Sequence, residues 1–169
     1  MKQILVDEKY KAEKKEITHS IFSILRDNNL LTLSTIQGNC PYSCSAYYIF
    51  DKNMNLYIWT EEKSTHSKNI KINSKVAVNI ADTSQKMGAN LKGLQMLGRA
   101  KIVSGTELIK AGTLYLKRFP NISKYIKEVK DFVSDEFESA IYKIEIEKIK
   151  VLDEESFGKE GYRFVSIKI

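Results

Sequence analysis

A chain of 169 residues, 43% of them hydrophobic and 28% charged, has the size and composition of one globular domain with its own core. The net charge of +6 comes from lysines that alternate with acidic residues, and no nucleic-acid motif accompanies them, which argues against a nucleic-acid-binding domain. No apolar run is long enough to cross a membrane, no segment has the length of a signal peptide, and two cysteines are too few for a disulfide framework, so we expect a cytoplasmic protein.

The first half of the chain predicts a helix followed by three strands. Within residues 1–28, apolar side chains recur at helical spacing on one stripe: Ile17, Ile21, Ile24 and Leu25. Alternating side chains predict strands over residues 30–36, 42–50 and 56–60, which short polar turns connect. Neighbouring strands joined in this way form antiparallel hairpins.

The second half returns to strands after each helical segment. A short helix is expected after the N-cap candidates Ser64 and Thr65, then strands over 75–81 and 94–103, with a bulge at Gly98. Residues 106–132 are expected to form a pair of helices (106–118 and 123–132), before a long strand over 139–152 and an edge strand within 157–169. This order favours a closed or nearly closed antiparallel barrel with peripheral helices, in a single domain over residues 1–169.

The segment from residue 56 to 70 has the strongest functional signal. A strand ends at Trp59-Thr60, and a loop with Lys63, Ser64, Thr65 and His66 leads into a helix. Free backbone N–H groups and the positive end of a helix dipole bind phosphate well, and hydroxyl and cationic side chains add donors. The alternative is an ordinary capped helix start, with His66 as a surface or capping residue.

Two further segments are candidates. Small side chains at Ser43, Cys44, Ser45 and Ala46 would leave a strand backbone open to a flat ligand, although small residues also occur where a strand packs against a helix. Gln95 and Arg99 interrupt an apolar strand, and Arg99 could equally be an exposed edge cation. Two histidines and a Cys-x-x-x-Cys pair on one strand make a metal site improbable.

Together these segments resemble the pyridoxamine 5′-phosphate oxidase-like family of split barrels that bind flavin mononucleotide (FMN). The resemblance covers residues 29–159 and is closer still to a small bacterial subgroup of uncharacterised proteins. It rests on four motifs: Thr-Glu-Glu-Lys-x-x-His from Thr60, Gly-x-Gln from Gly93, Arg-Phe-Pro from Arg118 and Phe-Gly-Lys from Phe157.

The resemblance implies a mainly β (α+β) fold, an antiparallel Greek-key split β-barrel with peripheral helices. It implies a homodimer with FMN at the subunit interface, and a small-molecule substrate for an FMN-dependent oxidoreductase. Its implied cofactor ligands are Ser43, Cys44, Ser45 and Ala46 along the ring, and Thr60, Lys63, Ser64, Thr65 and His66 around the phosphate and ribityl chain. Trp59 and Arg99 are further cofactor-binding candidates, and Gln95 would reach the flavin from the strand that borders the partner subunit.

Two departures from the family pattern qualify this expectation. Thr65 stands where the family usually has an arginine that binds the phosphate, and Lys63 or Arg99 is the expected substitute. The C-terminal segment has only Arg163, where true pyridoxamine phosphate oxidases are arginine-rich, which argues against that particular substrate. The alternative to an oxidoreductase is a non-catalytic flavin- or haem-binding module, because fold alone does not fix function.

Overall fold

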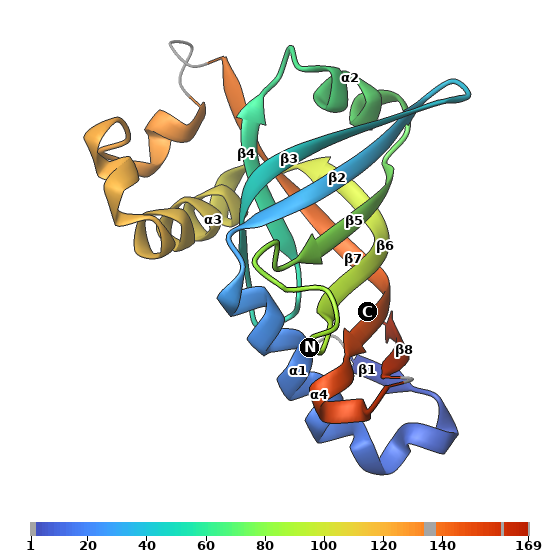
Figure 1. Cartoon of the computed structure of the whole chain (residues 1–169). Coiled ribbons are helices and arrows are strands. Elements are labelled where there is room, and N and C mark those ends of the chain that lie inside the picture. Colours follow the sequence, from blue (N-terminus) through green and yellow to red (C-terminus); the bar gives the residue numbers. More distant parts are fainter. Residues whose placement is uncertain (1–2, 134–137, 160, 169) are drawn as a thin grey trace.

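The computed structural model describes residues 3–133, 138–159 and 161–168, and its centre is a closed six-stranded antiparallel β-barrel (Figure 1). The strands follow one another around the barrel in the order β7, β4, β3, β2, β5 and β6, and β6 pairs with β7 to close it. Their bounds are β2 (Leu30–Gln37), β3 (Cys40–Phe50), β4 (Leu56–Glu61), β5 (Lys75–Ala81), β6 (Lys92–Ile102) and β7 (Ser139–Asp153). The predicted mainly β, split-barrel fold is therefore confirmed.

Alternation along the strands builds the core. In β5, Val76, Val78 and Ile80 are buried while the residues between them face outward, as the two-residue period of a strand requires. The pairing of β6 with β7 shifts register between Leu97 and Gly98. A side chain at Gly98 would lie 2.4 Å from the carbonyl oxygen of Glu145, so the predicted bulge occurs where only glycine fits.

Three helices lie around the barrel (Figure 1). Helix α1 (Lys14–Asp27) buries the predicted apolar stripe in the main core, preceded by a 3-10 turn, η1 (Glu8–Glu13). Helix α2 (Thr65–Ile72) follows β4 and packs mainly against β2, and α3 (Gly105–Arg118) lies outside the barrel against β3. Within the described residues, no helix is long and apolar enough to span a membrane.

The structure corrects two predicted elements. Residues 123–132 do not form a helix; the segment folds into two short 3-10 turns, η2 (Pro120–Lys124) and η3 (Val129–Val133). The C-terminal strand β8 (Tyr162–Lys168) is not an edge strand, because it lies between β7 and an unpredicted N-terminal strand, β1 (Gln3–Val6). A short α4 (Glu154–Phe157) connects β7 to β8.

Arg118, the last residue of α3, joins α3 to the end of α1. Its guanidinium donates to the carbonyl oxygens of Leu25 at 2.9 Å and Asn28 at 2.5 Å, and it stacks 5.0 Å from the ring centre of Tyr48. These bonds satisfy carbonyls that the C-terminus of a helix leaves without intrahelical partners.

We expect Arg118→Ala to lower the free energy of unfolding by about 3 kcal/mol, because charge-assisted hydrogen bonds and packing are lost together. Lys117→Ala is the matched control, since Lys117 is exposed on the same helix, and it should change stability by less than about 0.5 kcal/mol. Urea denaturation of both variants measures the difference. Equal effects of the two substitutions would show that Arg118 is not a structural link.

Candidate functional site

The corner between β4 and α2 is held by a cluster of serine hydroxyls. Ser64 is the N-cap of α2, and its side-chain oxygen accepts the backbone N–H of Ser67 at 3.3 Å. The Ser67 hydroxyl donates to the carbonyl of Glu61 at 2.7 Å. These bonds fix the first turn of the helix against the end of the strand, so the groups that lie there are positioned before any ligand arrives.

His66 lies at the centre of this corner and is only 9% exposed. Its Nε2 is 2.7 Å from Oγ1 of Thr60 and 3.1 Å from Oγ of Ser64. Tyr42 lies nearly parallel to the imidazole, with 6.5 Å between the ring centres. Nδ1 is buried and makes no hydrogen bond to any described residue. A buried nitrogen without a partner costs about 1–3 kcal/mol, which is relieved if a ligand or water supplies the partner.

Two neighbouring cavities meet at His66. The first, which we call the cleft, has a volume of about 450 Å³, and most of its lining residues carry polar side chains. Its lining residues are Trp59, Thr60, Glu61, Ser64, His66 and Ser139. The second, which we call the hollow, has a volume of about 640 Å³. Because both cavities are lined by Trp59, Thr60 and His66, they adjoin at these residues, and we treat them as two halves of one candidate site.

The hollow lies between the barrel wall and the segment that follows α3. From the barrel it is lined by Ser45, Ala46 and Tyr47 of β3 and by the end of β4. From the other side it is lined by Tyr115, Phe119, Asn121, Ile122 and Tyr125. Most of this lining is aromatic or aliphatic, so the hollow suits a flat apolar group.

Hydrogen bonds hold the walls of the hollow in place. The buried hydroxyl of Tyr115 lies 3.0 Å from the carbonyl oxygens of Tyr47 and Tyr57 and accepts the backbone N–H of Trp59 at 2.8 Å. Burial raises the pKa of Tyr115, so this phenol stays protonated. The indole N–H of Trp59 donates to the carbonyl of Phe132 at 3.0 Å. These bonds therefore link strands β3 and β4 to helix α3 and to the η3 turn at the base of the hollow.

Half of the predicted cofactor ligands meet in this site. Ser45, Ala46, Trp59, Thr60, Ser64 and His66 line the cleft or the hollow. Ser43 faces outward beside them on β3, where its hydroxyl lies 2.8 Å from that of Ser34. Cys44 points the other way, into the barrel, and burial raises the pKa of its thiol. A strand alternates its side chains, so four consecutive residues cannot all face one ligand.

Three predicted ligands lie away from the cleft. Lys63 is 2.6 Å from Glu138 in an exposed ion pair, and Arg99 is 2.9 Å from Glu147 on the outer face of β6. Thr65 is exposed at the first position of α2 and lines neither cavity. Neither Lys63 nor Arg99 therefore takes the place of the family's arginine within this subunit.

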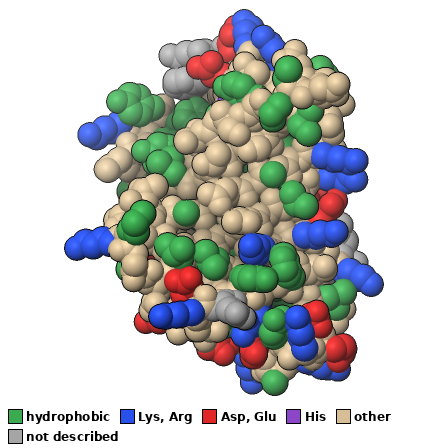
Figure 2. All heavy atoms as spheres, turned by 45° about the vertical axis from the view of Figure 1, so that its right-hand side comes forward, with side chains coloured by type: hydrophobic (Ala, Val, Ile, Leu, Met, Phe, Trp, Pro, Cys, Tyr) green, Lys and Arg blue, Asp and Glu red, His purple; other side chains and the backbone are tan. Residues whose placement is uncertain are grey.

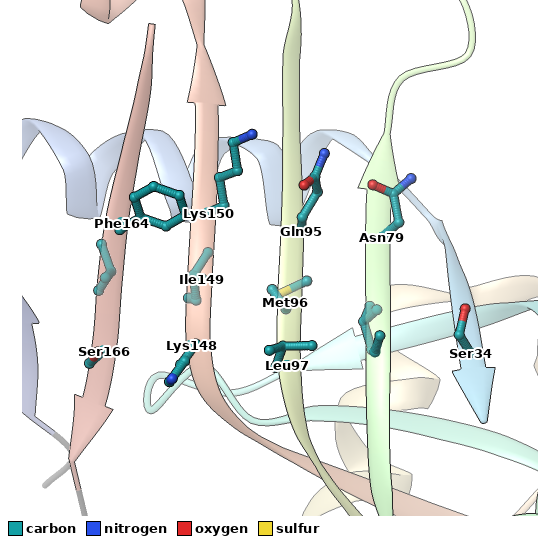
Figure 3. A pocket seen from close by; sticks show the side chains of 13 residues that line it. Ser34, Asn79, Gln95, Met96, Leu97, Lys148, Ile149, Lys150, Phe164 and Ser166 are labelled. Atoms are coloured by element: carbon teal, nitrogen blue, oxygen red, sulfur yellow. The ribbon is translucent and has the colours of Figure 1, made fainter. Parts of the chain in front are cut away.

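Gln95 lies on a different surface, the outer face of the sheet formed by β5, β6 and β7. There it faces Asn79 and Lys150 on the adjoining strands, and Figure 3 shows these three side chains projecting in the same direction. We call this surface the sheet face; it contains a shallow depression of about 780 Å³. Its other lining side chains include Ser34, Ala77, Leu97, Lys148, Phe164 and Ser166. In Figure 2 the middle of the view is largely uncharged, and most charged side chains lie toward the edges.

Sequence reasoning missed the outer wall of the hollow. The sequence singles out Phe119 only within the Arg-Phe-Pro motif and does not predict Tyr115, Asn121, Ile122 or Tyr125 as site residues. The signal in the sequence is the density of aromatic residues between 115 and 125, next to a proline that ends the helix. The structure adds that Tyr125 is 72% exposed at the cavity, where an aromatic side chain can contact a ligand.

The burial of His66 predicts a pH dependence of stability. Burial lowers the pKa of His66 below its usual value near 6.5, while Glu61 raises it by a smaller amount. The unfolded chain then binds a proton at a higher pH than the folded chain. The contribution of neutral His66 to the free energy of unfolding is therefore complete above the pKa that His66 has in the unfolded chain. It is lost as the pH falls toward the lower pKa of His66 in the folded chain.

We expect the wild-type protein to lose more stability on acidification from about pH 7 to pH 5 than His66→Gln does. His19→Gln is the control, since His19 is exposed on α1. Urea denaturation at several pH values in this range gives the free energy of unfolding of each variant and its slope against pH. If the wild-type and His66→Gln slopes coincide, His66 is not held neutral by burial.

The fold and the site define a class: a closed antiparallel split barrel with a cavity beside the β4–α2 corner. A sequence model of the family described as pyridoxamine 5′-phosphate oxidase matches residues 17–153. The chain therefore belongs to the pyridoxamine 5′-phosphate oxidase family.

Individual relatives agree with this assignment. A UPF0306 protein of Yersinia pestis is 36% identical over 97 residues, which are 57% of this chain and 65% of that protein, so the match spans less than two thirds of the relative. A putative pyridoxamine 5′-phosphate oxidase from Listeria innocua has a TM-score of 0.59 at 20% identity and covers 84% of this chain and 98% of its own. The haem storage protein HutZ from Vibrio cholerae has a TM-score of 0.67 at 13% identity, and the match covers 80% of this chain and 94% of HutZ. At such identities the structures show a shared fold.

Proposed function

We propose that this protein binds FMN in the joined cleft and hollow and works as an FMN-dependent oxidoreductase on a small molecule. The observation that carries the proposal is the pairing of a cavity lined mainly by residues with polar side chains and an aromatic one, both of which include Trp59, Thr60 and His66. FMN has the same two halves, a phosphate on a polar chain and a flat ring. When bound, the flavin supplies the electron transfer, and the protein supplies binding and orientation.

The residues of the cleft fit a phosphate. Thr60 and Ser64 offer hydroxyl groups, and the cleft lies at the N-terminus of α2, where Ser64 and His66 line it, so the free N–H groups and the positive end of the helix dipole would favour an anion there. His66 lines the cleft, and it would add a positive charge if the phosphate draws a proton onto it. Glu61 at the rim opposes the anion, which makes the hydroxyl and N–H donors more important.

The residues of the hollow fit the ring. Ser45 and Ala46 bring a strand with small side chains to one side, so a flat group can approach the backbone. Trp59 cannot swing into the space, because its indole N–H is bonded to the carbonyl of Phe132. The aromatic wall excludes water from the ring's edge, which favours hydride chemistry over side reactions.

We also propose that the active form is a homodimer that pairs through the sheet face. Its side chains on β2, β5 and β6 are small or uncharged, among them Ser34, Ala77 and Asn79, Leu97 is exposed, and the charged groups in its lining are Lys148 and Lys150 on β7. Such a surface is suited to burial against a second copy. In that assembly Gln95 would contact the flavin of the partner subunit, which accounts for its distance from the cleft of its own chain.

A haem-binding module is the second candidate, because an aromatic hollow without charges also suits a porphyrin ring. His66 is poorly placed as an axial ligand, since Nε2 is engaged by Thr60 and Ser64 and Nδ1 is buried. The remaining histidine, His19, is exposed on α1. The protein's own donors therefore favour flavin.

Visible absorption spectroscopy of the purified protein, with titrations of FMN, riboflavin and haem, tests the proposed function. We expect flavin bands and saturable binding of FMN, which is tighter than that of riboflavin because only FMN fills the cleft. Binding of haem with a sharp Soret band and no binding of FMN would replace the flavin proposal with the haem one.

A further inference from the structure

The hollow has a lining without charged groups. Among the described residues, its lining side chains are serine, threonine, asparagine, alanine, isoleucine and aromatic residues, including His66, whose burial favours the neutral form. Four of them have exposed or partly exposed rings: Tyr47, Trp59, Phe119 and Tyr125. Tyr47 and Phe119 meet edge to face, with 5.5 Å between the ring centres. The hollow is thus an aromatic surface without a counter-ion for an anion.

The nearest arginine on the wall segment is turned away from the hollow. Arg118 precedes Phe119, but its guanidinium is bonded to the carbonyls of Leu25 and Asn28 and stacks on Tyr48 and Phe50. Moving it toward the hollow would leave those carbonyls without these bonds, which is costly. Arg118 is therefore unavailable to bind a phosphate in the hollow.

The polar groups that the hollow offers to a ligand are all neutral. The hydroxyl of Tyr115 and the indole N–H of Trp59 are bonded to backbone carbonyls. The amide of Asn121 and the hydroxyl groups of Ser45, Tyr47 and Tyr125 make no hydrogen bond to any described residue. A ligand in the hollow can thus exchange neutral hydrogen bonds with these side chains and otherwise meets rings and aliphatic groups.

We propose that the hollow binds an uncharged, flat aromatic molecule against Phe119, Ile122 and Tyr125, beside the flavin ring, and discriminates against phosphorylated compounds. The inference deepens the proposed function, on which it rests, by naming the class of substrate. Its physical basis is desolvation: an anion that enters an apolar space without a counter-ion loses far more hydration energy than a neutral ring does. Stacking on the aromatic wall favours a flat molecule over an aliphatic one.

Isothermal titration of FMN-loaded protein with 1-naphthol and with 1-naphthyl phosphate tests the inference, because the two probes share a ring and differ in the phosphate. We expect 1-naphthol to bind at least about tenfold more tightly. Tyr125→Ala should weaken 1-naphthol about tenfold, whereas Lys117→Ala, which alters an exposed residue of α3 outside the lining, should not. Equal or tighter binding of the phosphate, or no binding of either probe, would overturn the inference.

A variant that gains binding distinguishes the proposed contact from a loss of folding, because an unfolded protein would not bind either probe more tightly. Ile122→Lys places a cation on the wall and should improve the binding of 1-naphthyl phosphate relative to 1-naphthol by about tenfold. Flavin fluorescence should change on addition of 1-naphthol if the two rings lie side by side. The same titrations on protein without FMN separate the two claims: if FMN fails to bind, the proposed function fails, while a retained preference for 1-naphthol still supports the uncharged hollow. Binding of 1-naphthol that FMN abolishes would contradict its place beside the flavin.

Discussion

Replacing Thr60 by valine and His66 by alanine together is expected to weaken FMN binding about a hundredfold and to leave riboflavin binding within about threefold of the wild type. The two side chains are removed as a pair because Nε2 of His66 lies 2.7 Å from Oγ1 of Thr60, so either single change leaves the other partner unsatisfied. Both line the cleft, where the phosphate end of FMN is proposed to lie, as well as the edge of the hollow, so the comparison with riboflavin isolates their effect on the phosphate. Fluorescence titration of each flavin measures the two affinities.

Lys63→Ala is the matched control for this double variant. Lys63 belongs to the same loop, but its ammonium is paired with Glu138 at the surface, so its loss should weaken FMN by less than about threefold. General destabilisation would lower the binding of both flavins alike. A parallel loss for FMN and riboflavin in the double variant, or a larger effect of Lys63→Ala, would contradict the assignment of the cleft to the phosphate.

Leu97→Asp is expected to convert the protein from a dimer to a monomer at micromolar concentration and to weaken FMN strongly. Leu97 is 53% exposed at the middle of the sheet face, next to Ala77 on β5 and Lys148 on β7. A carboxylate buried there between two copies would raise the dimer dissociation constant by more than about a hundredfold, since its loss of hydration exceeds what an ion pair with the neighbouring Lys148 returns. Light scattering and sedimentation measure the change in mass.

Ile109→Asp is the control for the dimer, because Ile109 is 59% exposed on α3, outside the sheet face. It should leave the mass and FMN affinity unchanged. A wild-type protein that is already monomeric, or a dimer that tolerates Leu97→Asp, would refute pairing through the sheet face. The phosphate assignment would be unaffected, because it depends on residues of a single chain.

Sequence reasoning succeeded where side-chain alternation is strong. The β-branched residues of β5 and the long pattern of β7 predicted the barrel strands, and Ser64 predicted the start of α2. It failed over 123–132, where Ile126 and Phe132 are buried as in a helix, but anchor short turns against α3 and β4. The sequence does not predict strand β1, because its four residues pair with β8 at the other end of the chain.

The candidate site was partly predictable for similar reasons. Local sequence places Thr60, Ser64 and His66 together, since strand, cap and first helical turn follow one another directly. The partner of Lys63 lies 75 residues further along, so no local pattern indicates that its charge is already paired. The aromatic wall depends on the packing of the segment after α3 against β3, which is likewise a long-range contact.

A crystal structure of the protein with FMN tests the central claim most directly. The account predicts phosphate density in the cleft, within hydrogen-bond distance of Thr60, Ser64 and the first turn of α2, with the ring beside Ser45 and Ala46. Flavin density elsewhere on the barrel, or a cleft that holds only water at saturating FMN, would contradict it.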